Sequence, residues 1–569
     1  MNLEQALNSN RHHIKQWRRY LRYDTNLKHI AFGIASSSNL WEIRKEYIKT
    51  WWRPKETRGV VWLDKKVVAK KGERLPEIRV SEDTSQFKYL NKVGSRSALR
   101  ITRVVSETLK LGMKDIRWFV MGDDDTIFVV ENLVRVLSKY DHTQYYYIGS
   151  ASESHIQNIL FSYSMAYGGG GFAISYPLAK ELSKMQDKCI HRYPALYGSD
   201  DRIQACMAEL GVPLTRELGF HQYDVVGDIL GLLGAHPVTP LVSLHHLDVV
   251  NPIYPGMKRA KALAHMLEAA NEDSASLMQQ SICYDSTRYW SITVSWGYAV
   301  QILRGVMSPR ELEMPSRTFF SWHKRADYTA YAFNTRPVER HPCQRPFVFY
   351  MYKTKTEPET NQTVGLYYRH RTRSRYCRWK MASPEKLDFV VVIKPRDEDR
   401  WLKAPRRDCC RAFPKIKNNT MILYVGNCKD VIFQYKALKC RTNKSKTGYI
   451  NRNENSSKLI RQSEANTEDS SNITFLDKQT REEGTYIPGR DNHQRMKKQS
   501  KTRRGMVWIQ ISAKGNIAER EAPPPLSFLA ALPTGIETGR WLPALIIFQQ
   551  MLQFATNFFN LLNTDFLKH

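Results

Sequence analysis

Apolar residues in the first half of the chain form short runs that alternate with longer amphipathic segments. The expected buried strands cover residues 29–35, 59–64, 116–121 and 145–148. The expected helices cover residues 40–52, with Asn39 able to cap the first turn, 95–111 and 131–140. Strands that alternate with helices are typical of an α/β domain with a largely parallel sheet. We therefore predict an α/β fold for this half.

The pattern changes after residue 250. Residues 257–273 have helical spacing, and strand-like runs follow at 291–303, 317–322, 346–350 and 389–393. Residues 441–514 are polar and poor in apolar side chains, which predicts disorder, and the last apolar stretch is interrupted by Gln and Asn. We predict four parts: a basic leader (1–26), the α/β domain (27–250), a β-rich, cysteine-containing appendage (251–440), and a largely disordered tail with a terminal apolar helix (441–569).

The net charge of +30 indicates which partners the chain can attract. A strong excess of Lys and Arg favours nucleotide phosphates, acidic glycans, anionic membrane surfaces or nucleic acid. The basic residues are spread along the chain, and no zinc-finger, RNP or basic-helix pattern accompanies them. We therefore expect no nucleic-acid partner.

The nine cysteines indicate in which cellular compartment the protein folds. None has the CxxC spacing of a zinc ribbon or thioredoxin site, and six of the nine follow residue 340. This clustering predicts a partly disulfide-bonded C-terminal region in an oxidising lumen, with at least one free thiol because the total is odd. Five N-x-S/T sites in the same half fit that location: Asn361, Asn418, Asn443, Asn455 and Asn472. No signal peptide or membrane-spanning segment is recognisable in the sequence.

The most informative chemistry follows the expected strand at 116–121. That run ends in Gly122 and three consecutive aspartates, Asp123, Asp124 and Asp125. Carboxylates at the end of a buried strand repel one another and lose hydration, so a positive charge must compensate them. Mg²⁺ and Mn²⁺ prefer such oxygen ligands and commonly bridge a carboxylate to substrate phosphates. We favour this metal site over the alternative, a solvated acidic turn.

Two further segments can contribute to a ligand pocket. Ser36 follows the first strand, where an α/β sheet opens its ligand crevice. The four glycines at 168–171 leave backbone N–H groups free to approach a ligand, although they lack the spacing of a dinucleotide-binding loop or a P-loop.

A second acidic pair, Asp200 and Asp201, precedes an expected helix at 202–210. Ser199 or Asp200 can cap that helix, which leaves a spare carboxylate that can serve as a general base. From this segment alone, helix capping is the favoured explanation of the pair. Histidines follow at His221, His236, His245 and His246, and a histidine at a strand end can complete an oxygen-rich metal site.

In this order the motifs resemble the Fringe-like β-1,3-glycosyltransferases. The segments that carry the resemblance are Gly122-Asp-Asp-Asp-Thr126, the glycine-rich loop, Gly198-Ser-Asp-Asp201, Gly219-Phe-His-Gln222 and Val242-Ser-Leu-His-His-Leu-Asp248. The segments Trp51-Trp-Arg-Pro54 and His236-Pro-Val-Thr-Pro240 resemble the plant branch of the family, formerly a plant domain of unknown function.

The resemblance implies a GT-A-type, Rossmann-like domain and a metal-dependent, inverting hexosyltransferase. Its donor would be a UDP-sugar, its cofactor Mn²⁺ or Mg²⁺, and its acceptor a hydroxyl of a glycan or glycoprotein, with a β-1,3 linkage as the product. The family is usually anchored in the Golgi by an N-terminal membrane helix, which this sequence does not show. The alternative is a non-catalytic protein on the same fold that binds a nucleotide sugar or a glycan.

The resemblance also implies roles for individual residues. Asp123 and Asp125 would bind the metal, with His245 as its histidine and His221 as the alternative. Donor contacts would come from Asp123, Asp124, Ser36, Gly169 and Gly170. Asp201 would be the general base, with Asp200 as the alternative.

Overall fold

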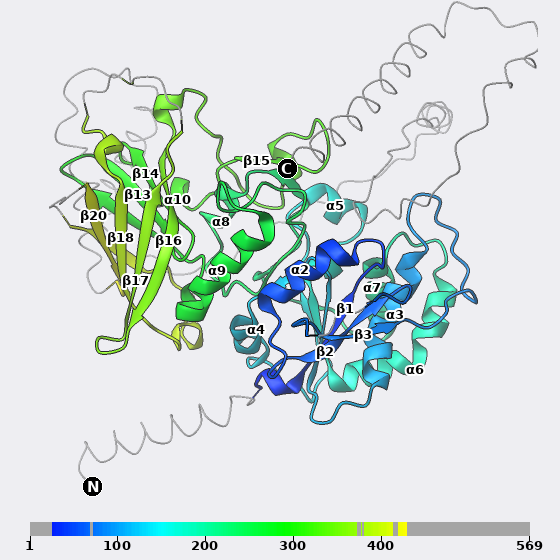
Figure 1. Ribbon diagram of the computed structural model, residues 1–569. Coiled ribbons are helices and arrows are strands. Elements are labelled where there is room, and N and C mark those ends of the chain that lie inside the picture. The colour runs from blue at the N-terminus through cyan, green and yellow to red at the C-terminus, as the bar shows by residue number, and fades with distance from the viewer. Residues whose placement is uncertain (1–24, 69–71, 373–376, 378–380, 414–418, 429–569) are drawn as a thin grey trace, which may run out of the picture. The chain divides into compact units, whose positions relative to one another are not determined.

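The computed structural model describes residues 25–68, 72–372, 377, 381–413 and 419–428 (Figure 1). The predicted disorder and terminal helix at 441–569, and nearly all of the predicted leader at 1–26, lie outside these residues.

A seven-stranded sheet forms the centre of the N-terminal half, in the order β3-β2-β1-β4-β7-β6-β8. Its strands are β1 (Ile30–Ala35), β2 (Arg58–Leu63), β3 (Glu77–Val80), β4 (Trp118–Asp123), β6 (Tyr147–Gly149), β7 (Phe172–Ser175) and β8 (Leu214–Arg216). Neighbouring strands are parallel except at β7, which runs antiparallel to both β4 and β6. The predicted α/β class is confirmed, with one strand reversed.

Helices connect these strands and cover the sheet (Figure 1). They are α2 (Trp41–Trp51), α3 (Ser97–Lys110), α4 (Val130–Leu137), α5 (His155–Leu160), α6 (Tyr176–Arg192), α7 (Ser199–Glu209), α8 (Leu230–Leu233) and α9 (Arg259–Asp273). Leu99, Val104 and Val105 of α3 are buried, as their helical spacing predicts. The N-cap of α2 is Leu40, so the expected cap at Asn39 is wrong.

Two small sheets lie beyond the central one. One contains β5 (Ile127–Phe128), β11 (Ser243–Leu244) and β9 (Phe220–His221), and the other pairs β10 (Val225–Gly227) with β15 (Phe319–Ser321). These short pairings hold together segments that are about 100 residues apart in sequence.

The β-rich region forms a closed barrel of strands in the order β12-β13-β14-β16-β17-β18-β20-β19. These are β12 (Gln280–Asp285), β13 (Trp290–Ser295), β14 (Ala299–Arg304), β16 (Phe347–Glu357), β17 (Gln362–Arg369), β18 (Phe389–Pro395), β19 (Cys409–Ala412) and β20 (Thr420–Gly426). The remaining short helices are α10 (Pro309–Leu312), η1 (Leu27–His29), η2 (Gly168–Gly170), η3 (Ser274–Ser276), η4 (Tyr328–Ala330), η5 (Pro342–Gln344), η6 (Pro384–Lys386) and η7 (Arg400–Leu402).

Four disulfides occur in the described part of the chain: Cys189–Cys206, Cys283–Cys410, Cys343–Cys377 and Cys409–Cys428. Cys283 and Cys410 join β12 to β19, the two strands at which the barrel closes. The ninth cysteine, Cys440, lies outside the described residues. None of the helices in the described ranges combines the length and apolar composition that a membrane crossing requires.

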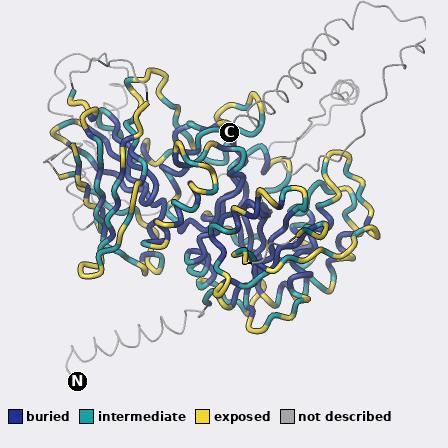
Figure 2. Tube along the Cα trace, in the orientation of Figure 1, coloured by how far each residue is buried: buried dark blue, intermediate teal, exposed yellow. Residues whose placement is uncertain are grey.

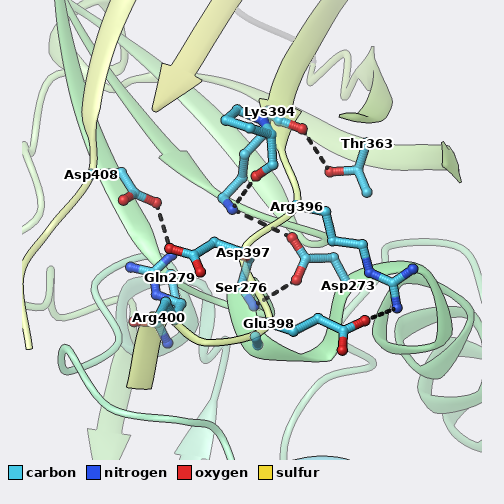
Figure 3. Close-up of polar contacts among 12 residues, drawn as sticks. Asp273, Ser276, Gln279, Thr363, Lys394, Arg396, Asp397, Glu398, Arg400 and Asp408 are labelled. Atoms are coloured by element: carbon cyan, nitrogen blue, oxygen red, sulfur yellow. Dashed lines mark hydrogen bonds and ion pairs between the residues drawn. The ribbon is translucent and has the colours of Figure 1, made fainter. Parts of the chain in front are cut away.

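One hydrophobic core is continuous from the central sheet into the barrel, and it includes Phe32, Phe128, Leu233, Trp296 and Val392. Buried stretches of the chain run through both the sheet and the barrel (Figure 2). A polar contact accompanies the core where α9 meets the barrel (Figure 3). Lys394 of β18 approaches Asp273 of α9 at 3.4 Å, and their side chains are 3% and 1% exposed. Asp273 also accepts the Ser276 backbone N–H at 3.2 Å. Breaking a buried pair of this kind leaves one charge without compensation.

We expect Asp273→Asn to lower the free energy of unfolding by about 3 kcal/mol, because Lys394 would remain buried and unpaired. Urea unfolding of the full chain measures this change. The double variant Asp273→Asn, Lys394→Met should recover most of the loss. Lys355→Met, which removes an exposed pair with Glu357, is the control and should change stability by less than about 1 kcal/mol. Equal losses in Asp273→Asn and Lys355→Met would contradict the role of the buried pair.

Candidate functional site

The candidate site lies at the carboxyl ends of β1 and β4. From β1 the chain continues to β2 and β3 on one side, and it later returns to place β4 on the other side. In open α/β sheets such a reversal of strand order opens a crevice for ligands. Ala35 and Asp123 are paired in register across the two strands, so Ser36 and the aspartates meet at this crevice.

The three aspartates are buried, as the sequence pattern predicts. The Asp123 backbone N–H donates to Thr126 Oγ1 at 2.8 Å, and the Thr126 hydroxyl donates to the Gly169 carbonyl at 2.7 Å. Thr126 therefore fixes both the aspartate turn and its distance from the glycine-rich loop.

Asp123, Asp125 and His245 form a group that could hold a metal ion. One ligand atom from each lies within 4.8 Å of the others. His245 Nε2 is 3.5 Å from Asp123 Oδ2 and 3.2 Å from Asp125 Oδ1. Within the described part of the chain, neither oxygen of Asp125 accepts a hydrogen bond of regular geometry, although its side chain is 0% exposed. Buried carboxylate oxygens of this kind, beside an imidazole, suit a divalent cation.

The glycine-rich loop is a close neighbour of these groups. A Cβ at Gly169 would lie 2.1 Å from His245 Cε1, and a Cβ at Gly168 would lie 2.6 Å from Asp200 Oδ1. Glycine is therefore required here because it lets two functional side chains approach the backbone. The expectation of free N–H groups is wrong for Gly170, whose N–H donates to Gln222 Oε1 at 2.7 Å.

Arg44 of α2 belongs to the site, and sequence reasoning missed it. Its Nη1 lies 2.9 Å from Asp124 Oδ1 and 3.2 Å from Asp125 Oδ1, while its Nη2 lies 2.8 Å from Asp248 Oδ2. Ser36 adds a hydrogen bond from its hydroxyl to Asp124 Oδ2 at 2.8 Å. Arg44 and Ser36 thus hold the Asp124 carboxylate. These contacts account for the positions of Ser36 and Asp124 without a direct contact to a sugar donor.

Burial and neighbouring charges act in opposite directions on these groups. Burial raises the pKa of Asp124 to about 6 despite the Arg44 guanidinium. Burial also opposes the charge of Asp125, but His245 and Arg44 hold its pKa well below the usual value. Burial disfavours a charged Arg44, yet Asp125, Asp124 and Asp248 outweigh it and raise the pKa of Arg44. The site therefore keeps at least one carboxylate ionised deep in the protein.

The two candidate bases have different surroundings. Asp201 accepts the backbone N–H groups of Tyr197 at 2.8 Å and Gly198 at 2.9 Å, so it caps the start of α7. The expectation that Ser199 or Asp200 caps this helix is therefore wrong: Gly198 occupies the N-cap. Burial raises the pKa of Asp201 to about 6. Asp200 instead lines a cavity together with Asp123, Gly168 and Phe172.

His221 lies apart from the aspartate group. Its Nδ1 is 2.7 Å from Glu153 Oε1, and its Nε2 is 2.9 Å from His236 Nε2. The structure thus brings His245, and not His221, to Asp123 and Asp125.

Two family models match overlapping parts of the chain. A model described as Fringe-like matches residues 25–230, and a model of proteins of unknown function, DUF604, matches residues 157–410. The first contains the sheet and the aspartates, and the second extends through most of the barrel.

Three relatives have known names. The β-1,3-N-acetylglucosaminyltransferase lunatic fringe of Xenopus laevis is 38% identical over 101 residues, which is 16% of this chain and 26% of that protein. The β-1,3-glucosyltransferases of Mus musculus and Homo sapiens are 29% and 30% identical over 153 and 105 residues, covering 26% and 18% of this chain and 29% and 20% of theirs.

The matched part spans less than a third of each relative's length. All three are animal proteins, so the resemblance to the plant branch stays an expectation. The Fringe-like match and the named relatives show that the chain contains a domain of the Fringe-like family, over residues 25–230.

Proposed function

We propose that the chain is a metal-dependent glycosyltransferase. It would move a hexose from a UDP-sugar to a hydroxyl of a glycan or glycoprotein, with inversion and a β-1,3 linkage. The observation that carries the proposal is the group of Asp123, Asp125 and His245 at the end of β4, in a chain whose named relatives are β-1,3-glycosyltransferases. The crevice between β1 and β4 supports a GT-A-type domain, because nucleotides bind at such points in open α/β sheets.

Mn²⁺ or Mg²⁺ is the proposed cofactor, held by Asp123, Asp125 and His245. When bound, such an ion neutralises the charge of a departing diphosphate. Arg44 and Ser36 hold Asp124 and, with it, the turn that presents the two ligand aspartates. Asp124 therefore has a positioning role in this proposal.

Asp200 is the proposed general base. It would take the proton of the acceptor hydroxyl while that oxygen attacks the anomeric carbon and the bond to the diphosphate breaks. Two features support Asp200 over Asp201: it lines the same cavity as Asp123, and both oxygens of Asp201 already accept backbone N–H groups. In this proposal, the first turn of α7 supplies Asp201 as the helix cap and Asp200 as the base.

The disulfides bear on the compartment. Four pairs in the described residues are typical of a protein that folds in an oxidising lumen. This supports the proposed location in the Golgi lumen or at its membrane.

We expect the purified full chain to release UDP from at least one of UDP-glucose, UDP-galactose and UDP-N-acetylglucosamine when Mn²⁺ is present, and EDTA to abolish the release. Asp123→Asn should lower the rate on the order of 100-fold, because a ligand to the cation is lost. Asp64→Asn is the control, since Asp64 directly follows β2 and accepts hydrogen bonds from Ser38 outside the metal group. Metal-dependent binding of a UDP-sugar without turnover would contradict catalysis and favour a binding protein.

Asp200→Asn should lower the turnover number by 100-fold or more with little change in stability, because removal of a general base costs about 10²–10⁴-fold. Asp201→Asn should instead lower stability by about 1 kcal/mol through the weakened cap, with a smaller effect on turnover. Initial rates and urea unfolding of both variants separate the two roles. A larger loss of turnover in Asp201→Asn would reverse the assignment.

Asp124 should make the metal-free protein less stable as pH rises from about 4 to about 6. Its folded pKa of about 6 lies above the ordinary value of 3.8, so between those values the folded state binds more protons than the unfolded state. Stability contributed by the protonated form is therefore lost as pH increases through this window. Urea unfolding in EDTA at several pH values should show a shallower decline for Asp124→Asn. An unchanged slope would contradict the raised pKa.

A further inference from the structure

His246 lies beside the metal group without belonging to it. Its ring is 3.8 Å from that of His245, centroid to centroid. Its backbone φ of 55° is in the left-handed region, which a residue other than glycine adopts at a cost. The planes of the two consecutive imidazole rings are tilted by 34° to each other.

Asp224 fixes the orientation of that second ring. The Asp224 carboxylate is buried, with Oδ1 3.1 Å from His246 Nδ1 and Oδ2 accepting the Ser152 hydroxyl at 2.5 Å. The 3.1 Å contact places Nδ1 beside the carboxylate, although Nδ1 makes no hydrogen bond of regular geometry within the described residues. The His246 side chain keeps 11% of its surface exposed.

Trp322 covers the other side of His246. Its ring centroid is 4.8 Å from that of His246, at an interplanar angle of 36°. The Trp322 backbone N–H donates to the Asp224 carbonyl at 3.3 Å, and the preceding Ser321 pairs with Val225 across β15 and β10. The indole is half-buried, and within the described ranges its N–H donates to no protein atom. Three rings thus continue outward from the metal group: His245, His246 and Trp322.

We propose that Trp322 and His246 form a subsite for a pyranose ring, namely the sugar that accepts the transferred hexose. A sugar has an apolar C–H face, which an indole can cover, and a hydroxyl edge, which an imidazole nitrogen can bind. Arg44, Ser36 and Asp124 occupy the β1 side of the metal group, whereas His246 lies against the His245 ring. The subsite therefore suits the acceptor better than the nucleotide. It rests on the proposed function, since an acceptor exists only if sugar is transferred.

The test uses the full chain and two separate readouts. The first is binding of UDP with Mg²⁺ by calorimetry. The second is saturation-transfer NMR with the methyl β-pyranosides of glucose, galactose, xylose and N-acetylglucosamine, in the presence of UDP and Mg²⁺. The variants are Trp322→Ala, Trp322→Phe and the control Phe320→Ala, which removes an aromatic ring from β15, the strand just before Trp322, at a position that is 67% exposed.

We expect at least one methyl pyranoside to bind the wild-type chain. Its Kd should rise about tenfold in Trp322→Ala, consistent with the loss of an aromatic contact, and less in Trp322→Phe. UDP affinity should stay within twofold in all variants, and Phe320→Ala should match the wild type in both readouts.

Three outcomes overturn the subsite: no pyranoside binds the wild type, Trp322→Ala retains the wild-type Kd, or Trp322→Ala weakens UDP and pyranoside equally. The last result would mean that Trp322 only supports His245. A wild-type chain that binds no UDP with metal would overturn the proposed function itself, which the calorimetric readout detects independently.

Discussion

The structure around the site depends on negative charge that the fold has buried. Asp123, Asp124 and Asp125 follow a strand with no exposed residue, and Asp248 adds a fourth carboxylate through Arg44. Unpaired charges at this depth would cost several kcal/mol each. One guanidinium and one imidazole offset part of this charge, and the uncompensated remainder is compatible with a divalent cation held by Asp123, Asp125 and His245. Helix α2 places the Arg44 guanidinium, and strand β11 places the His245 imidazole, within about 3 Å of the carboxylates, where opposite charges attract strongly.

The glycine-rich loop shows how this electrostatic demand becomes a packing constraint. Gly169 has no room for a side chain because His245 occupies that space, and Gly168 is limited in the same way by Asp200. The loop thus contacts both the proposed metal ligand His245 and the proposed base Asp200. Backbone groups of Gly169 and Gly170 form hydrogen bonds with Thr126, Gln222 and Ser243, which anchor the loop. Glycine here serves close packing, whereas the sequence alone predicts backbone N–H groups that are free to approach a ligand.

Local patterns in the sequence predict the elements of this fold, but not the contacts between distant segments. The strand that ends in aspartates, the helices and the α/β class follow from local patterns, and the structure bears them out. Arg44 could not be predicted because 80 residues separate it from Asp124, and its helix looks like any amphipathic segment. The choice between Asp200 and Asp201 depends on which side of one helical turn faces the cavity, which spacing does not reveal. The barrel closure is equally non-local: it joins β12 to β19, and a disulfide spans 127 residues there.

The two matching family models cover different parts of the site. The Fringe-like match ends at residue 230 and contains the aspartates, whereas His245, His246 and Trp322 lie beyond it, within the second match. Segment 319–332 is bound to the α/β domain through β10 and through the Ala332 N–H, which donates to the Glu153 carbonyl. The neighbouring Ser152 holds Asp224, so the same loop supports both the imidazole and the indole. The side of the metal group away from β1 is therefore built by later parts of the chain, which allows its chemistry to differ between proteins that share the aspartate turn.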